Sequence, residues 1–156
     1  MTNTFFPMLR KQATRRRFLQ QSGLLLASGA CINPDLFAQT PVSNAELDAQ
    51  LFPGFDVKTI DTNDVSIHTL VGGSGPPVLL LHGAPQSHFA WAEVAVQLAR
   101  DFTVVATDLR GYGWSSKPDG GENHINYSKR TMAQDQFNVM NMLGMFYFDL
   151  AGHDPD

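Results

Sequence analysis

The chain has 156 residues, of which 43% are hydrophobic and 17% charged, a length and composition that suit one globular domain. Residues 39–156 hold six basic and fourteen acidic residues, and this balance argues against nucleic acid as a partner because no basic stripe is left to neutralise phosphates. The single cysteine, Cys31, excludes an internal disulfide, and no apolar run reaches the roughly 18 residues that a membrane-spanning helix needs.

The first 38 residues have the features of an export signal. Five basic residues precede a short apolar stretch at 23–30. The order Thr-Arg-Arg-x-Phe-Leu, which starts at Thr14, resembles the twin-arginine export signal. This resemblance implies the twin-arginine export machinery as a partner, cleavage after Ala38 and a periplasmic location in a bacterium. Two alternatives stay open: a lipoprotein anchored at Cys31, and an amphipathic helix that belongs to the folded protein.

The next two segments predict a linker and a hairpin. Residues 39–55 are rich in proline, alanine and polar residues, so we expect a linker with one helical turn. Residues 56–61 and 65–71 alternate between apolar and polar positions on either side of a short polar turn, which predicts an antiparallel hairpin. His68 falls on the polar face of the second strand, and we expect it to be exposed to solvent.

The rest of the chain alternates between strands and helices. A glycine-rich loop at 72–77 precedes a strand and not a helix, so it predicts a turn and not a phosphate cradle. The expected elements then follow in this order: a strand at 78–81, a helix from about residue 88 to Asp101, a strand at 102–107, a helix from Ser128 with Gly144 as its C-cap, and a strand at 146–150. This alternation predicts an α/β fold with a mostly parallel sheet, crossover helices and the hairpin at one edge.

Three loops are expected at the carboxyl ends of the parallel strands, where ligands bind in open α/β sheets: 82–88, 108–118 and 152–156. In the second loop, we expect Asp108 and Arg110 to brace the rim by ion pairing. The five histidines form no spaced cluster with cysteine or acidic residues, so the sequence predicts no metal site and no cofactor.

Four motifs carry a resemblance to a known family. They are His-Gly-Ala-Pro-Gln-Ser-His-Phe-Ala-Trp at 82–91, Asp-Leu-Arg-Gly-Tyr-Gly-x-Ser-x-Lys-Pro at 108–118, Asn-Tyr-Ser-Lys-Arg-x-Met-Ala-x-Asp-Gln at 126–136, and Gly-His-Asp at 152–154. The chain resembles the α/β-hydrolase superfamily from about Phe52 to Asp154, and within it the haloacetate (fluoroacetate) dehalogenases, with epoxide hydrolases as close relatives. The resemblance implies that residues 56–156 form the N-terminal half of an α/β-hydrolase core, which ends at the nucleophile elbow.

In that family the position of Asp154 is the nucleophile, held in a tight strand-turn-helix elbow. A carboxylate can displace halide from a short haloacid and form an ester, which water then hydrolyses. The substrate implied is therefore a small molecule, a short haloacid or an epoxide. The tyrosines that polarise an epoxide in the relatives would lie beyond this sequence, so both substrates stay open.

The resemblance also suggests roles around the elbow. The loop formed by His82, Gly83, Ala84 and Pro85 matches the oxyanion-side loop, with the N–H of Ala84 toward the reacting group and a cis Ala84–Pro85 bond. We expect His82 to shape this loop by hydrogen bonding and not to act as an acid or base. For His88 two roles stay open, a pocket wall or a helix cap. His153 is a further candidate for the pocket.

The elbow departs from the family pattern at Pro155 and Asp156, where the relatives have arginine and glycine. Proline restricts the residue before it to extended conformations and has no N–H to donate to an oxyanion. The arginine of the relatives binds the substrate carboxylate, and their acid and general-base histidine match no residue before Asp156. We therefore expect low catalytic competence, and keep a non-catalytic fragment as an alternative.

The sequence also predicts a weakness in folding. The apolar strand at 146–150 would form an unpaired edge, and we expect self-association through it. The strands at 78–81 and 102–107 would each lack a covering helix on one face.

Overall fold

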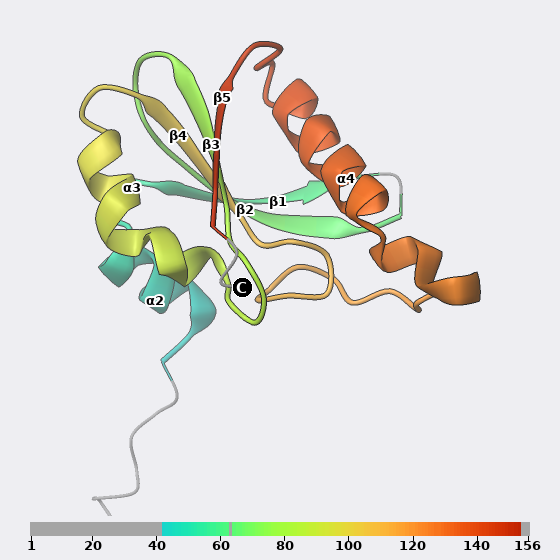
Figure 1. Cartoon of the computed structure of the whole chain (residues 1–156). Helices are drawn as coiled ribbons and strands as arrows, with labels where there is room; N and C mark the ends of the chain where they lie inside the picture. Colours follow the sequence, from blue (N-terminus) through green and yellow to red (C-terminus); the bar gives the residue numbers. More distant parts are fainter. Residues whose placement is uncertain (1–41, 63, 154–156) are drawn as a thin grey trace, which may run out of the picture. The chain divides into compact units, whose positions relative to one another are not determined.

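The computed structural model describes residues 42–62 and 64–153, which leaves the predicted export signal and Asp154 outside the described residues. Five strands form one mixed sheet in the order β1-β2-β4-β3-β5 (Figure 1). The elements follow along the chain as α2 (Asn44–Leu51), β1 (Asp56–Asp61), β2 (Ser66–Gly73), β3 (Pro77–Leu81), η2 (His88–Trp91), α3 (Ala92–Leu98), β4 (Thr103–Thr107), η3 (Glu122–Tyr127), α4 (Lys129–Met142) and β5 (Asp149–Gly152).

The strand pairings confirm the predicted α/β fold. β2 pairs antiparallel with β1, as the hairpin predicts, and also antiparallel with β4. β3 runs parallel to both β4 and β5, and these pairings require crossover connections, which α3 and α4 provide. The carboxyl ends of β3, β4 and β5 therefore lie at the same edge of the sheet.

Both faces of the central strands are covered, so the prediction of an uncovered face is wrong. α2 and α3 lie on one side of the sheet and α4 on the other (Figure 1). In β3, Val78 and Leu80 belong to the apolar cluster that includes α3, whereas Leu79 packs with Met140 of α4. The sequence pattern correctly predicted that these strands are buried. The second face of β3 and β4, which was expected to lack a helix, is covered by α4.

The predicted linker at 39–55 is wrong for its described part, because α2 is a full helix. Its start is a capping box, in which the Ser43 hydroxyl accepts the N–H of Glu46 while the Glu46 carboxylate accepts the N–H of Ser43. The residue after the helix, Phe52, is 1% exposed and belongs to the core. The helix has no continuous apolar stripe and instead buries Asp48, so hydrophobic periodicity could not predict it.

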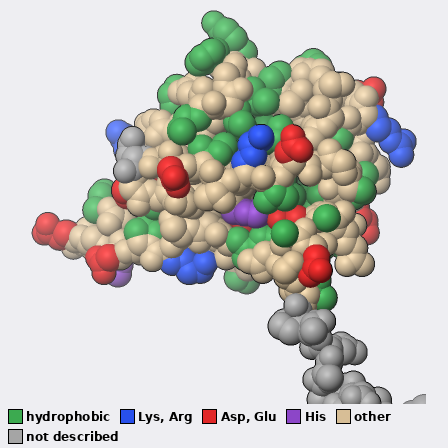
Figure 2. Space-filling view, turned by 180° about the vertical axis from the view of Figure 1, so that it is seen from behind, with side chains coloured by type: hydrophobic (Ala, Val, Ile, Leu, Met, Phe, Trp, Pro, Cys, Tyr) green, Lys and Arg blue, Asp and Glu red, His purple; other side chains and the backbone are tan. Residues whose placement is uncertain are grey.

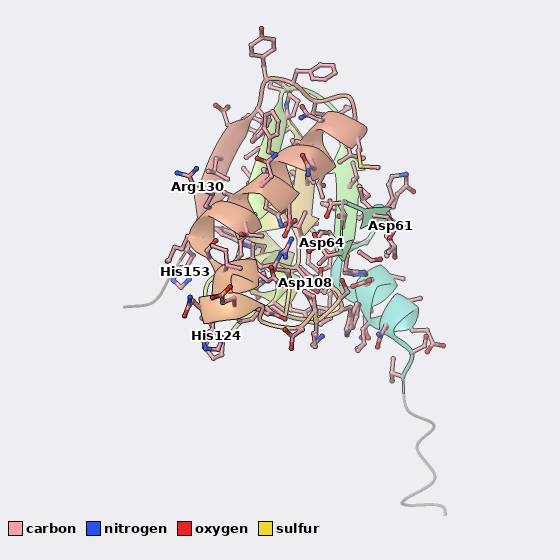
Figure 3. The ribbon with its side chains drawn as sticks, turned by 90° about the vertical axis from the view of Figure 1, so that its right-hand side faces the viewer. Asp61, Asp64, Asp108, His124, Arg130 and His153 are labelled. Carbon is pink, nitrogen blue, oxygen red and sulfur yellow. The ribbon has the colours of Figure 1, made fainter. Side chains whose placement is uncertain are left out.

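α4 has the ends that the sequence predicts. The Ser128 hydroxyl accepts the N–H of Thr131 at the N-terminus. At the C-terminus, Gly144 has φ +76°, and the N–H of Met145 donates to the carbonyl of Met140, as in a Schellman motif. Figure 3 shows α4 lying across the sheet, with Asp64 beyond one side of the helix and His153 beyond the other.

The last strand is displaced from its predicted position, since β5 begins at Asp149 and not at residue 146. The parallel register with β3, which pairs Leu79 with Leu150, decides where the strand lies, and the apolar residues before it are left in a loop. Among the described residues, β5 pairs only with β3, and Phe146, Tyr147 and Leu150 are exposed. Self-association through this edge stays a prediction.

The surface agrees with the composition. On the face that Figure 2 shows, lysine and arginine side chains are few and lie apart from one another, so that face offers no basic stripe. Within residues 42–62 and 64–153, none of the helices has both the length and the hydropathy needed to cross a bilayer.

Candidate active site at the carboxyl edge of the sheet

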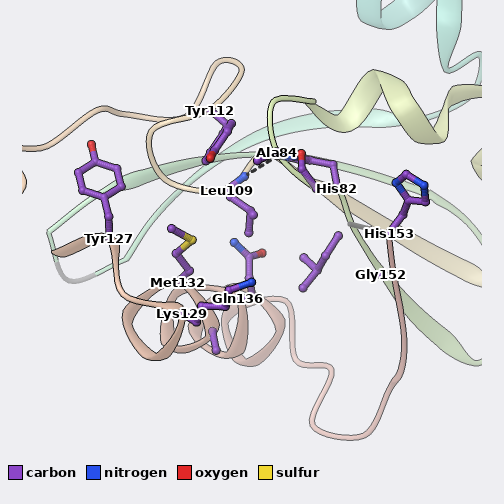
Figure 4. A pocket seen from close by; sticks show the side chains of 13 residues that line it. His82, Ala84, Leu109, Tyr112, Tyr127, Lys129, Met132, Gln136, Gly152 and His153 are labelled. Carbon is purple, nitrogen blue, oxygen red and sulfur yellow. Dashed lines mark hydrogen bonds between the residues drawn. The ribbon is translucent and has the colours of Figure 1, made fainter. Parts of the chain in front are cut away.

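Loops from distant parts of the chain enclose a cavity of about 510 Å³ at the carboxyl ends of β3 and β5 (Figure 4). The first α4 turns form its opposite wall. The cavity is lined by Leu81, His82, Gly83, Ala84, Leu109, Tyr112, Tyr127, Lys129, Met132, Ala133, Gln136, Gly152 and His153. The loops that were predicted to lie at the carboxyl ends of the parallel strands therefore do meet there. Pro85 and His88, which were expected in this site, are not among the lining residues.

His82 holds the loop after β3 in place with both of its ring nitrogens. Nδ1 lies 3.0 Å from the carbonyl oxygen of Gly83, and the N–H of Leu109 donates to Nε2 over 3.0 Å. Nε2 must then be the unprotonated nitrogen, which leaves Nδ1–H to donate to Gly83. This geometry agrees with the expected structural role of His82. The Ala84–Pro85 bond is cis, as the resemblance implied.

The residues before Asp154 lie against this loop. The N–H of His153 donates to the carbonyl of Leu81 over 3.2 Å, which extends the pairing of β5 with β3. The His153 side chain is exposed, and its Nδ1 lies 3.3 Å from Oε1 of Gln86. The chain thus enters the predicted elbow beside the loop that was expected to stabilise an oxyanion. Asp154 itself lies outside the described residues.

A second group of polar side chains is buried behind the same loops. Asp48 Oδ2 lies 3.0 Å from Nε2 of His68, and Asp48 Oδ1 lies 2.9 Å from Nε2 of His88. On the far side of His88, Nδ1 lies 3.0 Å from Oδ1 of Asp108 without forming a hydrogen bond to it. All four side chains are buried. We call these four residues the Asp–His cluster.

The cluster corrects two predictions. His68 is buried and not solvated, because Asp48 of α2 supplies a carboxylate that satisfies its ring nitrogen. His88 neither lines the cavity nor caps a helix through its side chain, because that side chain packs between Phe52 and Trp114 and faces two carboxylates. The sequence carried no signal for Asp48, since it lies in the segment that was predicted to be a linker.

Burial and charge shift the pKa values in the Asp–His cluster in different directions. Burial lowers the pKa of His68 below its ordinary value, and the nearby Asp48 carboxylate opposes this only in part. Burial also acts to lower the pKa of His88, but the contacts with Asp108 and Asp48 outweigh it and raise that pKa. For Asp108, burial is outweighed by His88 and by the N–H groups that it accepts, so its pKa is lowered.

The loop after β4 is braced as predicted, by both of the residues named for it. The Asp108 carboxylate accepts the backbone N–H of His88 over 2.7 Å and that of Trp114 over 2.8 Å, which joins two loops. Arg110 pairs with Asp135 of α4 and with Asp64. These ion pairs raise the pKa of Arg110 further above its ordinary value.

The sequence predicted no metal site, but the fold brings three suitable side chains together. Asp48, His68 and His88 each offer one donor atom, and these atoms lie within 4.8 Å of one another. They are far apart in the sequence, so spacing could not reveal them. Nitrogen and carboxylate donors are typical of zinc sites.

Comparison with known proteins assigns the family. The family model of the α/β hydrolase fold matches residues 76–154, which include β3, the loops that line the cavity and β5. The chain therefore belongs to the α/β-hydrolase family.

Individual relatives fall into the branches that the motifs indicated. The chain is 55% identical over 104 residues to a fluoroacetate dehalogenase from Burkholderia sp, which covers 67% of this chain and 34% of that protein. It is 45% identical over 92 residues to a soluble epoxide hydrolase from Corynebacterium sp., with 59% and 30% covered. A crystal structure of a proposed α/β hydrolase from Nostoc sp PCC 7120 superposes with a TM-score of 0.63 and 54% identity, and covers 64% of this chain and 34% of that one.

The chain spans about a third of the length of the curated relatives that it matches. The part matched by the family model includes residues 82–85 and continues to residue 154. Activities and substrates of the whole relatives are therefore properties of those proteins.

Proposed function

We propose that this chain carries the nucleophile part of a haloacid-hydrolysing site, with Asp154 as the nucleophile. A carboxylate oxygen of Asp154 attacks the carbon that bears the halogen, the carbon–halogen bond breaks with its electron pair leaving on the halide, and an ester forms. Water then cleaves the ester to give a hydroxyacid and the free carboxylate. The observation that carries the proposal is the shared cavity, which is lined both by Ala84 of the oxyanion-side loop and by Gly152 and His153 directly before Asp154.

The character of the cavity supports a small anionic substrate. Leu109, Met132 and Ala133 give it an apolar wall that can exclude water from a short carbon chain. Lys129 contributes a positive charge to the same wall, which favours a carboxylate over a neutral molecule. The identity to a fluoroacetate dehalogenase points in the same direction.

Epoxide hydrolysis is the second candidate. Tyr112 and Tyr127 line the cavity, and a tyrosine hydroxyl can donate to the oxygen of an epoxide as the ring opens. The hydroxyl of Tyr127 already donates to the carbonyl of Pro118 over 2.7 Å, so Tyr112 is the better placed of the two. The identity to a soluble epoxide hydrolase supports this candidate.

Pro155 is expected to lower the rate of the reaction at Asp154. In this fold the N–H of the residue after the nucleophile is one of the two oxyanion donors, and proline has none. The loss of one such donor costs roughly 10²–10³ in rate. We therefore propose that Asp154 reacts slowly in this chain and that Pro155→Arg restores part of the rate.

Mass spectrometry of the intact chain tests both candidates. After incubation with chloroacetate or fluoroacetate, we expect released halide and a carboxymethyl ester on Asp154, formed faster in Pro155→Arg. With an epoxide, the whole molecule would add and no halide would appear. Asp154→Asn should abolish the adduct, whereas Asp149→Asn, which removes an exposed acid of β5, should leave it unchanged. If neither the natural chain nor Pro155→Arg forms an ester with any of these compounds, the nucleophile proposal is wrong.

We also propose that residues 1–38 direct the chain to the periplasm by the twin-arginine route. The support is the order of residues from Thr14 to Leu19. Replacement of Arg15 and Arg16 by lysine, followed by cell fractionation, tests the route. We expect the protein to remain in the cytoplasm, and undiminished periplasmic protein would count against it.

A further inference from the structure

Three residues of the Asp–His cluster come from separate elements that converge on one point. Asp48 comes from α2, His68 from β2 and His88 from η2. The two imidazole Nε2 atoms face the two oxygens of a single carboxylate, at 3.0 and 2.9 Å. All three side chains are buried, and none lines the cavity at the carboxyl ends of β3 and β5. The arrangement thus gathers two nitrogen donors and one oxygen donor at a place that the proposed hydrolysis does not use.

The Asp–His cluster contains two carboxylates whose negative charge a bound cation would neutralise. Asp48 and Asp108 place two carboxylates in the interior, where an uncompensated charge is costly. One divalent cation carries the charge that neutralises both. Asp108 is itself fixed by the N–H groups of His88 and Trp114, so it cannot turn toward solvent without losing two hydrogen bonds.

Asp108 also lies next to the ring nitrogen of His88 that would not bind the metal. Its Oδ1 lies 3.0 Å from Nδ1 of His88, on the side of the ring opposite to Asp48. A histidine that binds a metal through one nitrogen usually presents the other to a carboxylate, which fixes its tautomer and orientation. His88 therefore has a carboxylate next to each of its ring nitrogens, and a small shift of Asp108 would let it accept a hydrogen bond from Nδ1.

We propose that Asp48, His68 and His88 bind one zinc ion, with Asp108 as the positioning residue behind His88. Two imidazoles and a carboxylate are ligands typical of Zn²⁺, with bonds of about 2.0–2.2 Å and donor atoms roughly 3.3 Å apart in a tetrahedron. The donor atoms here lie within 4.8 Å of one another, so small side-chain shifts complete the site. A water molecule would complete the tetrahedron.

The surroundings favour a structural ion over a catalytic one. The rings of Trp114 and Phe89 pack against His88, with centroids 5.1 and 4.1 Å away, and leave little room for a substrate. The ion would tie α2 and η2 to β2 in the middle of the fold. This role is independent of Asp154, so it can hold or fail regardless of the proposed hydrolysis.

Zinc titration of the full chain tests the site. The chain is stripped with a chelator and carries Cys31→Ser, so that the thiol cannot compete. We expect calorimetry with zinc chloride to give one ion per chain, and the melting temperature to rise with free zinc because the ion binds only the folded state. His68→Asn should remove this binding event, and Asp108→Asn should weaken it about 10–100-fold.

Matched controls separate this site from adventitious binding. His124→Asn and His153→Asn each remove one other described histidine, and both should bind zinc like the parent chain. Cobalt titration of the parent gives a reading that does not depend on a variant folding, because Co²⁺ in a four-coordinate site with nitrogen and oxygen ligands absorbs visible light. If the parent chain binds no zinc, or His68→Asn binds it equally well, the four side chains hold one another without a metal and the proposal is overturned.

Discussion

Arg110 and Asp135 form a two-point ion pair in the interior, in which Nε lies 2.6 Å from Oδ2 and Nη2 lies 2.6 Å from Oδ1. Both side chains are buried. The pair joins the loop after β4 to α4, two parts of the chain that otherwise approach across the cavity. A planar guanidinium against a carboxylate fixes distance and orientation together, so the pair sets the width between these walls.

The first prediction concerns this pair. Asp135→Asn leaves the buried Arg110 charge without its main partner, and we expect a loss of about 3–5 kcal/mol in the free energy of unfolding. Asp64→Asn is the matched control, because the Asp64 side chain is 55% exposed and its pairing with Arg110 should contribute only about 0–1 kcal/mol. Urea unfolding of both variants measures the two losses. Equal losses in the free energy of unfolding would show that the buried ion pair contributes no more to stability than the exposed one.

The second prediction concerns Gly113. Its φ is +44°, and a Cβ built at this position would lie 2.0 Å from Oδ2 of Asp108. Gly113→Ala should therefore push Asp108 away from the N–H groups that it accepts and strain the backbone. Gly144→Ala provides the comparison, since Gly144 also has a positive φ of +76° but open space around it.

The two glycine variants separate clash from strain. We expect Gly144→Ala to cost about 1–2 kcal/mol for the left-handed conformation alone, and Gly113→Ala to cost clearly more. Thermal unfolding followed by circular dichroism gives both values. A Gly113 variant as stable as the Gly144 variant would mean that the Asp108 loop yields without penalty.

The third prediction concerns Thr107 and Gln136. The Thr107 hydroxyl donates to Oε1 of Gln136 over 2.7 Å, and the Nε2 of Gln136 is buried without a hydrogen-bond partner among the described residues. Gln136→Met should cost about 1–3 kcal/mol because the buried Thr107 hydroxyl loses its acceptor. The double variant Gln136→Met with Thr107→Val removes both polar groups, and we expect its stability to return close to that of the natural chain. A double variant that is less stable than Gln136→Met alone would contradict this account.

The fourth prediction tests whether α2 belongs to the folded domain. Phe52→Ala removes a ring that is 1% exposed, and we expect a loss of about 3–5 kcal/mol. Leu51→Ala changes the neighbouring residue, which is 41% exposed, and should cost much less. The measurement is again urea unfolding. Similar small effects of both variants would restore the interpretation of residues 39–55 as a linker.

The sequence predicted the sheet well because its strands carry their own signals. The apolar run at 78–81 arises from the two faces that the strand buries, which is a local property. In β1 the prediction rested on less, because Ile60 is the one residue of this strand that is buried. The caps of α4 were predictable as another local property, since Ser128 and Gly144 act within one helical turn. The position of β5 was not, because pairing with β3 determines it and the residues at 146–148 are more apolar than the strand itself.

The candidate site was predictable only where family motifs cover it. The loop at 82–85 lies beside the approach to Asp154, as its motif implied. The Asp–His cluster could not be predicted, because Asp48, His68 and His88 are separated by long stretches and meet only in the folded chain. His68 even occupies a position that alternation assigns to solvent. When a buried polar residue forms its hydrogen bonds with a residue far away in the sequence, the periodicity of apolar positions does not reveal that it is buried.

The order of the strands has a consequence for how the sheet assembles. β1 and β2 are neighbours both in sequence and in space, whereas β3 and β5 pair across a stretch that includes η2, α3, β4, η3 and α4. Closing a short loop costs less entropy than closing a long one, so the hairpin can form early and the β3–β5 pair only late. The strand that leads to Asp154 is then the last to dock, and the amide protons of β5 should exchange with solvent sooner than those of β2 and β4.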